Sequence, residues 1–242
     1  MGLGRKIILI ICLIVFIGSA GVLADYFING MKEQNALEDL KDLQTEREDL
    51  ITDKGTVMGK YADLYLANGD IIGWVTVEDT KIDYPVMQTQ SDPEYYIRRG
   101  FDKESTSSGT PFMDATSDIF VPTSNFLIYG HNMKNGSMFG LLRKYFKDKD
   151  SVPGRYIWIC TPDKNYRYEI FSSHVVDAAG ETYTLFPEAN EQFASYLDSM
   201  KQQSLVDFGT EVTKEDKVIT LSTCTGNDAT RFVVQAKREG EY

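Results

Sequence analysis

Short apolar stretches recur along most of the chain, and turn residues separate them. Within each stretch apolar residues alternate with polar ones or run together, and β-branched and aromatic residues are frequent, as in strands buried on one or both faces. The stretches cover residues 71–77, 82–87, 110–113, 125–129, 156–160, 166–176, 218–221 and 231–237. Recurring short strands with few helices predict a mainly β domain, either a barrel or a sandwich.

Four other segments follow helical spacing. They are Met31 to Leu50, Val57 to Leu66, Ser137 to Tyr145 and Pro187 to Gln203, and the last of them precedes the strand at 218–221. The helix at 31–50 is either a stalk, a dimerising coil or a helix packed on the domain. We favour packing, because its leucine stripe covers about two heptads and a coiled coil needs about three or four.

The N-terminal segment is strongly apolar. Ile7 to Ala24 is uncharged, follows Arg5 and Lys6, and precedes Asp25. It is near the lower length limit for a membrane-spanning helix, and the flanking charges predict a cytoplasmic N-terminus with the rest of the chain outside. A cleaved signal peptide is the alternative, since small residues occur near its end. We favour a retained anchor, because the apolar run is long and leads straight into a helix.

These patterns divide the chain into four parts. Residues 1–6 form a cytoplasmic tip, residues 7–24 a transmembrane anchor, residues 25–68 a helical extension and residues 69–242 the β domain.

Composition narrows the function. The net charge of -11 argues against nucleic acid, whose binding depends on Lys and Arg contacts to phosphates. Only Cys160 and Cys224 lie outside the apolar segment, so no disulfide framework is expected. The two histidines and these cysteines are scattered, which makes a structural zinc site unexpected.

The strand at 218–221 leads into Ser222-Thr223-Cys224, and a glycine follows at position 226. A strand end holds a side chain firmly, while the loop after it stays accessible. Cys224 is therefore a candidate nucleophile, and Arg231, at the start of the next strand, is expected to face it across a hairpin. The alternative is a buried structural cysteine with a surface arginine.

The two histidines differ in position. His131 follows a strand in Gly130-His131-Asn132, whereas His174 lies in the middle of a strand and is expected to be structural or at the surface. A Cys224 thiolate could attack a carbonyl, and a His131 imidazolium could protonate the leaving amine. Arg231 could donate hydrogen bonds to the developing oxyanion or hold the substrate backbone.

At this point the sequence resembles the sortases, the membrane-anchored cysteine transpeptidases of Gram-positive bacteria. Thr220-Leu221-Ser222-Thr223-Cys224 matches the family's TLxTC motif, and Gly130-His131-Asn132 and Arg231 match in kind and chain order. The resemblance covers residues 70–237. Further segments resemble class B members, namely the helical extension, Gly73-Trp74, residues 82–86, residues 94–101, Phe112-Met113-Asp114 and the helix at 187–203. The loop between Cys224 and Arg231 is shorter than in several class B members, so we assign Asp228 no role.

The resemblance implies an eight-stranded β-barrel with a helical insertion before the cysteine strand. It implies Cys224, His131 and Arg231 as catalytic residues in one groove, with Ser222 and Thr223 as candidate substrate-binding residues. The substrate would be a C-terminal sorting motif of a secreted protein, of an NPxTG-like type, cleaved at a Thr-Gly-type bond through a Cys224 thioester. A peptidoglycan-precursor amine or a pilin lysine would accept the acyl group, with the catalytic domain extracellular. No metal or other cofactor is expected.

Two other functions remain open. A cysteine peptidase that only hydrolyses would use the same thioester, and a non-catalytic membrane-anchored module could use the groove for binding. The helix at 187–203 and the strand after it are the expected wall of the specificity pocket.

Overall fold

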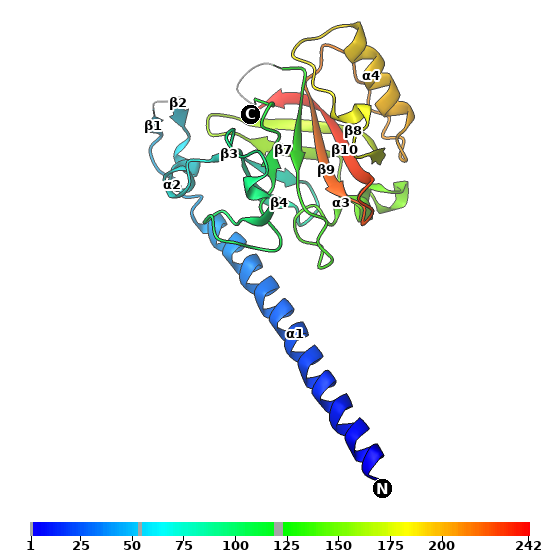
Figure 1. Ribbon diagram of the computed structural model, residues 1–242. Coiled ribbons are helices and arrows are strands. Elements are labelled where there is room, and N and C mark those ends of the chain that lie inside the picture. Colours follow the sequence, from blue (N-terminus) through cyan, green and yellow to red (C-terminus); the bar gives the residue numbers. More distant parts are fainter. Residues whose placement is uncertain (1, 53–54, 119–122) are drawn as a thin grey trace. The chain divides into compact units, whose positions relative to one another are not determined.

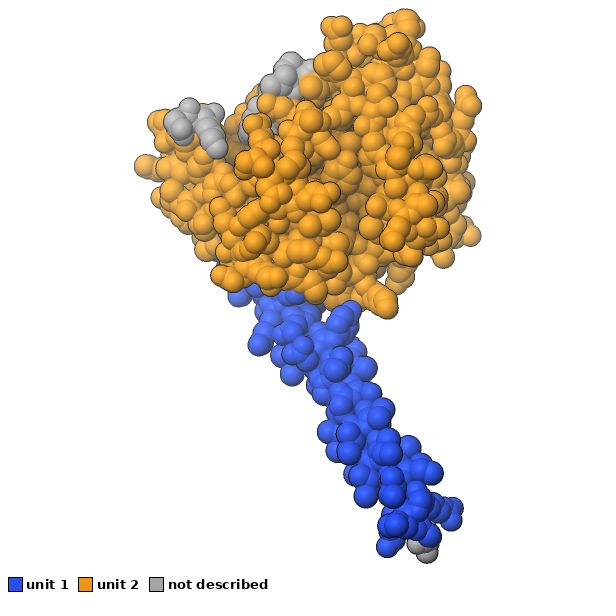
Figure 2. Space-filling model, viewed as in Figure 1, with its two compact units in different colours: residues 1–42 blue, residues 43–242 orange. Residues whose placement is uncertain are grey.

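The computed structural model describes residues 2–52, 55–118 and 123–242, which form two compact units, residues 1–42 and 43–242 (Figure 2). The first unit is the single helix α1 (Leu3–Asp42), 40 residues long, and none of its residues is buried. Its apolar part has a mean hydropathy of 3.0 over 18 residues, so by length and composition it could cross a membrane. The predicted apolar segment at 7–24 and the start of the helix at 31–50 are therefore one continuous helix.

The predicted helix at 31–50 is too long at its C-terminal end. The helix ends at Asp42, and Leu50 instead lies in strand β1 (Leu50–Thr52), which pairs with β2 (Gly55–Val57) in a small antiparallel sheet. Polar side chains in residues 45–49 bond to the next helix, α2 (Gly59–Ala67), rather than continuing α1. Thr45 and Arg47 contact Asp63, and Asp49 Oδ1 accepts a hydrogen bond from the Gly59 amide at 2.8 Å.

The expected eight-stranded barrel is confirmed (Figure 1). Its strands are β3 (Ile71–Val77), β4 (Asp83–Met87), β5 (Phe112–Met113), β6 (Asn125–Tyr129), β7 (Tyr156–Cys160), β8 (Asn165–Asp177), β9 (Val218–Cys224) and β10 (Thr230–Glu241). They close in the order β10-β8-β7-β3-β4-β5-β6-β9. β9 extends beyond the predicted Leu221 to Cys224, because Ser222 and Thr223 continue the pairing with β10 and both are buried.

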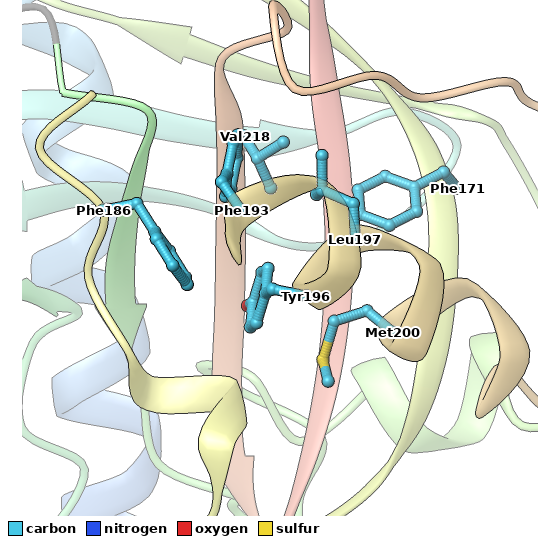
Figure 3. Packing of buried hydrophobic residues seen from close by; sticks show 7 residues of the cluster. All are labelled: Phe171, Phe186, Phe193, Tyr196, Leu197, Met200 and Val218. Carbon is cyan, nitrogen blue, oxygen red and sulfur yellow. The ribbon is translucent and has the colours of Figure 1, made fainter. Parts of the chain in front are cut away.

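The helical insertion before the cysteine strand is also confirmed, as α4 (Glu191–Gln202). It begins after Pro187, because Asn190 caps it by accepting a hydrogen bond from the Phe193 amide at 2.8 Å. Its apolar face packs on the barrel (Figure 3). The cluster consists of Phe171, Phe186, Phe193, Tyr196, Leu197, Met200 and Val218.

The remaining helical segments are short. α3 (Leu142–Phe146) is shorter than the predicted 137–145, because Met138 has a positive φ of 53° and residues 133–140 form consecutive turns. Among the residues that the structure describes there are also three 3₁₀ turns, η1 (Tyr95–Arg98), η2 (Lys149–Ser151) and η3 (Glu181–Tyr183).

Strand direction decides where the candidate residues meet. β6 and β9 are parallel neighbours, with Tyr129 opposite Ser222, so the residues that follow β6 and those that end β9 lie at the same edge. β10 runs antiparallel to β9 and pairs Arg231 with Cys224. The topology thus brings His131, Cys224 and Arg231 to one end of the barrel.

Candidate active site

All five predicted site residues line one groove with a volume of about 400 Å³. Its walls come from the segment around η1, from β5 and β6, from the segment 178–183, and from the ends of β9 and β10. The lining residues are Pro93, Glu94, Ile97, Thr110, Phe112, Asp114, Ala115, Tyr129, Gly130, His131, Ala178, Tyr183, Ser222, Thr223, Cys224 and Arg231. The placement of Cys224, His131 and Arg231 in a single concave site makes concerted chemistry possible there.

Cys224 is half-buried, and its backbone is fixed to the end of β6. Asn132 Nδ2 donates to the Cys224 carbonyl oxygen at 2.7 Å, and Thr223 Oγ1 donates to the Gly130 carbonyl oxygen at 2.8 Å. The Gly130 amide in turn donates to the Ser222 carbonyl oxygen at 3.1 Å. These bonds join the two strand ends, so the thiol and the imidazole share one rigid support.

Position 130 has room only for glycine. A Cβ atom there would lie 2.7 Å from the ring of Phe139, closer than side-chain carbons approach one another. The buried Phe139 ring thus restricts the residue before His131 to glycine, which explains the Gly-His pair seen in the sequence.

The ring of His131 is oriented by a main-chain group. Its Nε2 lies 2.7 Å from the Ile97 carbonyl oxygen. A carbonyl can only accept, so Nε2 carries a hydrogen, and Nδ1 is the nitrogen that gains or loses a proton. Burial lowers the pKa of His131, and the nearby Arg98 charge lowers it further, against the opposing effect of the Ile97 hydrogen bond. The neutral ring is therefore favoured at neutral pH.

Arg231 lies directly opposite Cys224 in the β9–β10 ladder. Its Nη1 donates to the carbonyl oxygens of Asp228 and Thr230, both at 2.9 Å. These bonds use one nitrogen of a group with five N–H donors, so the guanidinium keeps donors for a ligand in the groove. Asp228 is exposed and bonds to Arg231 through its main chain.

Tyr183 is a groove residue that the sequence analysis missed. Its hydroxyl lies 2.9 Å from Ser222 Oγ, and its ring stacks on Tyr129 with centroids 6.2 Å apart. Burial raises the pKa of Tyr183, a rise that the Ser222 hydrogen bond and the Arg231 charge oppose and Cys224 adds to. Tyr183 ends the short 3₁₀ turn η3 between β8 and α4, where no periodic pattern marks it.

The predicted wall of the specificity pocket, the helix at 187–203 and the strand after it, is confirmed only for the strand. Strand β9 lines the groove through Ser222 and Thr223, but the segment that faces them is 178–183, which precedes α4. The apolar face of α4 packs on the barrel instead (Figure 3). The groove lining therefore includes no residue of the predicted helix at 187–203.

The other histidine and cysteine lie outside the groove. His174 is 1% exposed, and its Nδ1 is 2.9 Å from Ser172 Oγ, while its Nε2 has no partner among the described residues. Burial lowers the pKa of His174 to about 4, so the ring is neutral. Cys160 is half-buried, and burial raises the pKa of its thiol. Within residues 2–52, 55–118 and 123–242 no group of His, Cys, Asp and Glu could hold a metal ion.

Comparison with known proteins gives one family. The family model described as Sortase domain matches residues 75–239. Sortase B of Listeria monocytogenes is 35% identical over 242 residues, which cover 97% of this chain and 96% of that protein. Sortase B of Staphylococcus aureus is 27% identical over 184 residues, 75% of each chain. The crystal structure of sortase B from Bacillus anthracis in complex with AAEK1 superimposes with a TM-score of 0.76 at 29% identity, covering 88% of this chain and 98% of that one.

Proposed function

Because this chain belongs to the sortase family and is a cysteine transpeptidase of the class B type, we propose that it cleaves a C-terminal sorting motif of secreted proteins with Cys224 as its nucleophile. The observation that carries the proposal is the convergence of Cys224, His131 and Arg231 in one groove. The bond cleaved is of the Thr-Gly type, in an NPxTG-like motif, and the acyl group passes to an amine of the cell wall.

Acylation follows from the positions of the three residues. The Cys224 thiolate attacks the threonine carbonyl carbon, and a tetrahedral oxyanion forms. Arg231, opposite the thiol, donates hydrogen bonds to that oxygen from the donors its main-chain contacts leave over. His131 gives its proton to the leaving amine, the carbon–nitrogen bond breaks, and a thioester remains on Cys224.

Deacylation reverses these roles. A neutral amine attacks the thioester carbonyl, and the neutral His131 accepts the proton that the amine loses. The sulfur leaves as the thiolate, so the enzyme returns to the thiolate and imidazolium pair. Since burial and the Arg98 charge lower the pKa of His131, the imidazolium is a minority form at neutral pH. At neutral pH most of the enzyme therefore carries the neutral ring that accepts the amine proton, while the lowered pKa makes the imidazolium a stronger acid toward the leaving amine.

The two candidate substrate-binding residues take different parts. Ser222 Oγ faces the groove beside the Tyr183 hydroxyl, where both can bond to a polar group of the sorting motif. The Thr223 hydroxyl is already bonded to the Gly130 carbonyl oxygen, so Thr223 borders the groove and mainly holds β6 to β9.

The N-terminal helix supports a location at the cell membrane. We place residues 1–6 in the cytoplasm, residues 7–24 in the bilayer and the catalytic domain, residues 69–242, outside. Residues 25–68 connect them. Tethering would raise the effective concentration of enzyme, substrate and membrane-bound acceptor at one surface. The acceptor is a peptidoglycan-precursor amine or a pilin lysine.

Mass spectrometry of the acyl-enzyme tests the proposal. Incubation with a panel of sorting peptides should add the mass of the acyl fragment to wild-type protein and not to the Cys224→Ala variant. Turnover by Cys224→Ala would refute the mechanism. An added amine should divert product from the acid to the amide, and unchanged partitioning would leave a hydrolytic peptidase.

A thiol-specific reagent tests the non-catalytic alternative. Cys224 should react faster than Cys160, whose thiol pKa is raised by burial and which serves as the internal reference. If Cys224 reacted no faster than Cys160, a binding module would be the better description.

A further inference from the structure

A run of positive charge lies next to the thiol but outside the groove. Residues 134–149, which we term the basic segment, contain five basic residues and one acidic one, within a chain of net charge -11. The five are Lys134, Arg143, Lys144, Lys147 and Lys149, and all are exposed. Within the described part of the chain, none of them takes part in an ion pair. None of the five is therefore paired directly with a carboxylate, while Asp148 and Asp150 flank Lys149 in the sequence.

The basic segment is held firmly against the strand ends. Leu142 and Phe146 are fully buried, and the Phe146 carbonyl oxygen accepts a hydrogen bond from Ser173 Oγ at 2.7 Å. α3 packs beside β10 (Figure 1). With these apolar residues turned inward, the neighbouring basic side chains of α3 point to solvent. Arg143 and Lys147, four residues apart, lie on the same side of it.

Arg143 marks how close this charge lies to the reaction. Its Nη1 lies 3.5 Å from the carbonyl oxygen of Thr225, the residue that follows Cys224. Yet the residues lining the groove include none of the basic segment. Arg143 thus brings the basic segment to the residue after Cys224, outside the groove, where a second substrate would approach once the acyl chain fills the groove.

Resting on the proposed function, we infer that the basic segment is the docking surface for the acceptor, and that it selects an amine carrying carboxylate or phosphate groups. The rest of this acidic protein repels such a molecule, so attraction is local to the segment. Positive charge near the incoming amine also disfavours its ammonium form, and the neutral amine is the nucleophile. A lysine-rich acceptor is disfavoured, because the positive charge of the basic segment repels it.

The inference is tested by comparing two acceptor peptides as substrates of the full chain, held in phosphatidylcholine nanodiscs. They are Gly-Gly-Gly amide, which carries no charge besides that of its amino group and is termed the neutral acceptor, and the acidic peptide Gly-Gly-Gly-Glu-Glu, both supplied after acylation by a sorting peptide. At low salt kcat/KM should be higher for the acidic acceptor, and the advantage should disappear at high salt. Substituting Arg143, Lys144 and Lys147 together by Gln should lower kcat/KM about tenfold for the acidic acceptor and less than twofold for the neutral one.

Control variants separate charge from structure. Lys81→Gln removes an exposed charge from the turn between β3 and β4 and should change neither acceptor. Arg143→Lys should keep most of the preference. Equal kcat/KM for the two acceptors in the wild type, or an undiminished preference in the triple variant, would overturn the inference. So would a charge effect that appears only in phosphatidylglycerol nanodiscs, since the segment would then contact lipid.

A binding measurement tests the docking surface independently of the proposed reaction. Anisotropy of dye-labelled Gly-Gly-Gly-Glu-Glu on Cys224→Ala protein should show weaker binding after the triple substitution. If no acyl-enzyme forms in the wild type, the proposed function fails. The binding measurement then still tests whether the basic segment is a docking surface. Binding that does not depend on the three charges would exclude it.

Discussion

Replacement of Asn125 by Ala should loosen one wall of the groove without unfolding the barrel. Asn125 begins β6 and is 1% exposed. Its Nδ2 donates to the Thr184 carbonyl oxygen at 2.8 Å, and its Oδ1 accepts from the Phe186 amide at 2.7 Å. These two bonds fix the segment that directly follows Tyr183. Asn125 thereby positions Tyr183 against Ser222 while lying outside the groove itself.

The two hydrogen bonds set the magnitude. If the segment stayed in place, Asn125→Ala would leave a carbonyl and an amide unpaired, at about 1–3 kcal/mol each. Release of the segment into water would instead lose the burial of Phe186, about 1.5–3 kcal/mol. Release is the less costly response, so we expect a global loss of stability of no more than about 3 kcal/mol. A loss of 1.4 kcal/mol in groove binding corresponds to about a tenfold higher KM.

Steady-state acylation kinetics and hydrogen exchange provide the assay. KM for the sorting peptide should rise about tenfold with a smaller change in kcat, and amides of residues 181–186 should exchange faster. The isosteric Asn125→Asp keeps the acceptor to Phe186 but sets a carboxylate oxygen against the Thr184 carbonyl, so it should behave like Ala. A variant with lower stability but unchanged KM and unchanged exchange at 181–186 would refute the positioning role.

Three further predictions follow from other contacts of the site and the core. Arg98→Gln removes a charge that lowers the pKa of His131, so that pKa should rise, and the titration of the His131 ring followed by NMR should move to higher pH; an unmoved titration would exclude the interaction. His174 has a folded-state pKa of about 4 against an ordinary 6.5. Its contribution to the free energy of unfolding is therefore complete above pH 6.5 and is lost as the pH falls toward 4. In urea unfolding, the loss of free energy of unfolding between pH 6.5 and pH 4 should therefore be smaller in His174→Gln than in the wild type by roughly 3 kcal/mol. The variant should retain turnover. A loss as large as that of the wild type would contradict the assignment. Thr223→Val keeps the shape but removes the bond to the Gly130 carbonyl oxygen, which should cost about 1–3 kcal/mol of stability and slow acylation in single-turnover measurements; an unchanged acylation rate would mean that the bond does not align the strand ends.

Local pattern was sufficient for the barrel strands and for much of the site. Ile71–Val77, Asn125–Tyr129 and Tyr156–Cys160 were predicted to the residue, because each combines β-branched or aromatic residues with turn signals at both ends. The position of Cys224 and His131 at strand ends was also readable, since each follows an apolar run. Closure of eight strands into a barrel came from family resemblance, because pattern alone left a sandwich open.

Features that depend on distant contacts were not readable. The parallel pairing of β6 with β9 joins segments more than ninety residues apart, and Asn132 bonds to a residue 92 positions away. Tyr183 bonds to Ser222, 39 residues away, and Asn125 holds the segment beyond it. The end of α1 was misplaced because residues 45–49 use their side chains on α2, a tertiary contact that outweighs helix propensity.

The position of β10 between β8 and β9 has a consequence for biosynthesis. β10 follows every other barrel strand in chain order, so it leaves the ribosome last, yet it closes the barrel and carries Arg231. Until it inserts, β9 has a free edge and Cys224 has no guanidinium opposite it. A chain that ends before β10 therefore displays the Cys224 thiol without the Arg231 guanidinium that stands opposite it in the folded barrel.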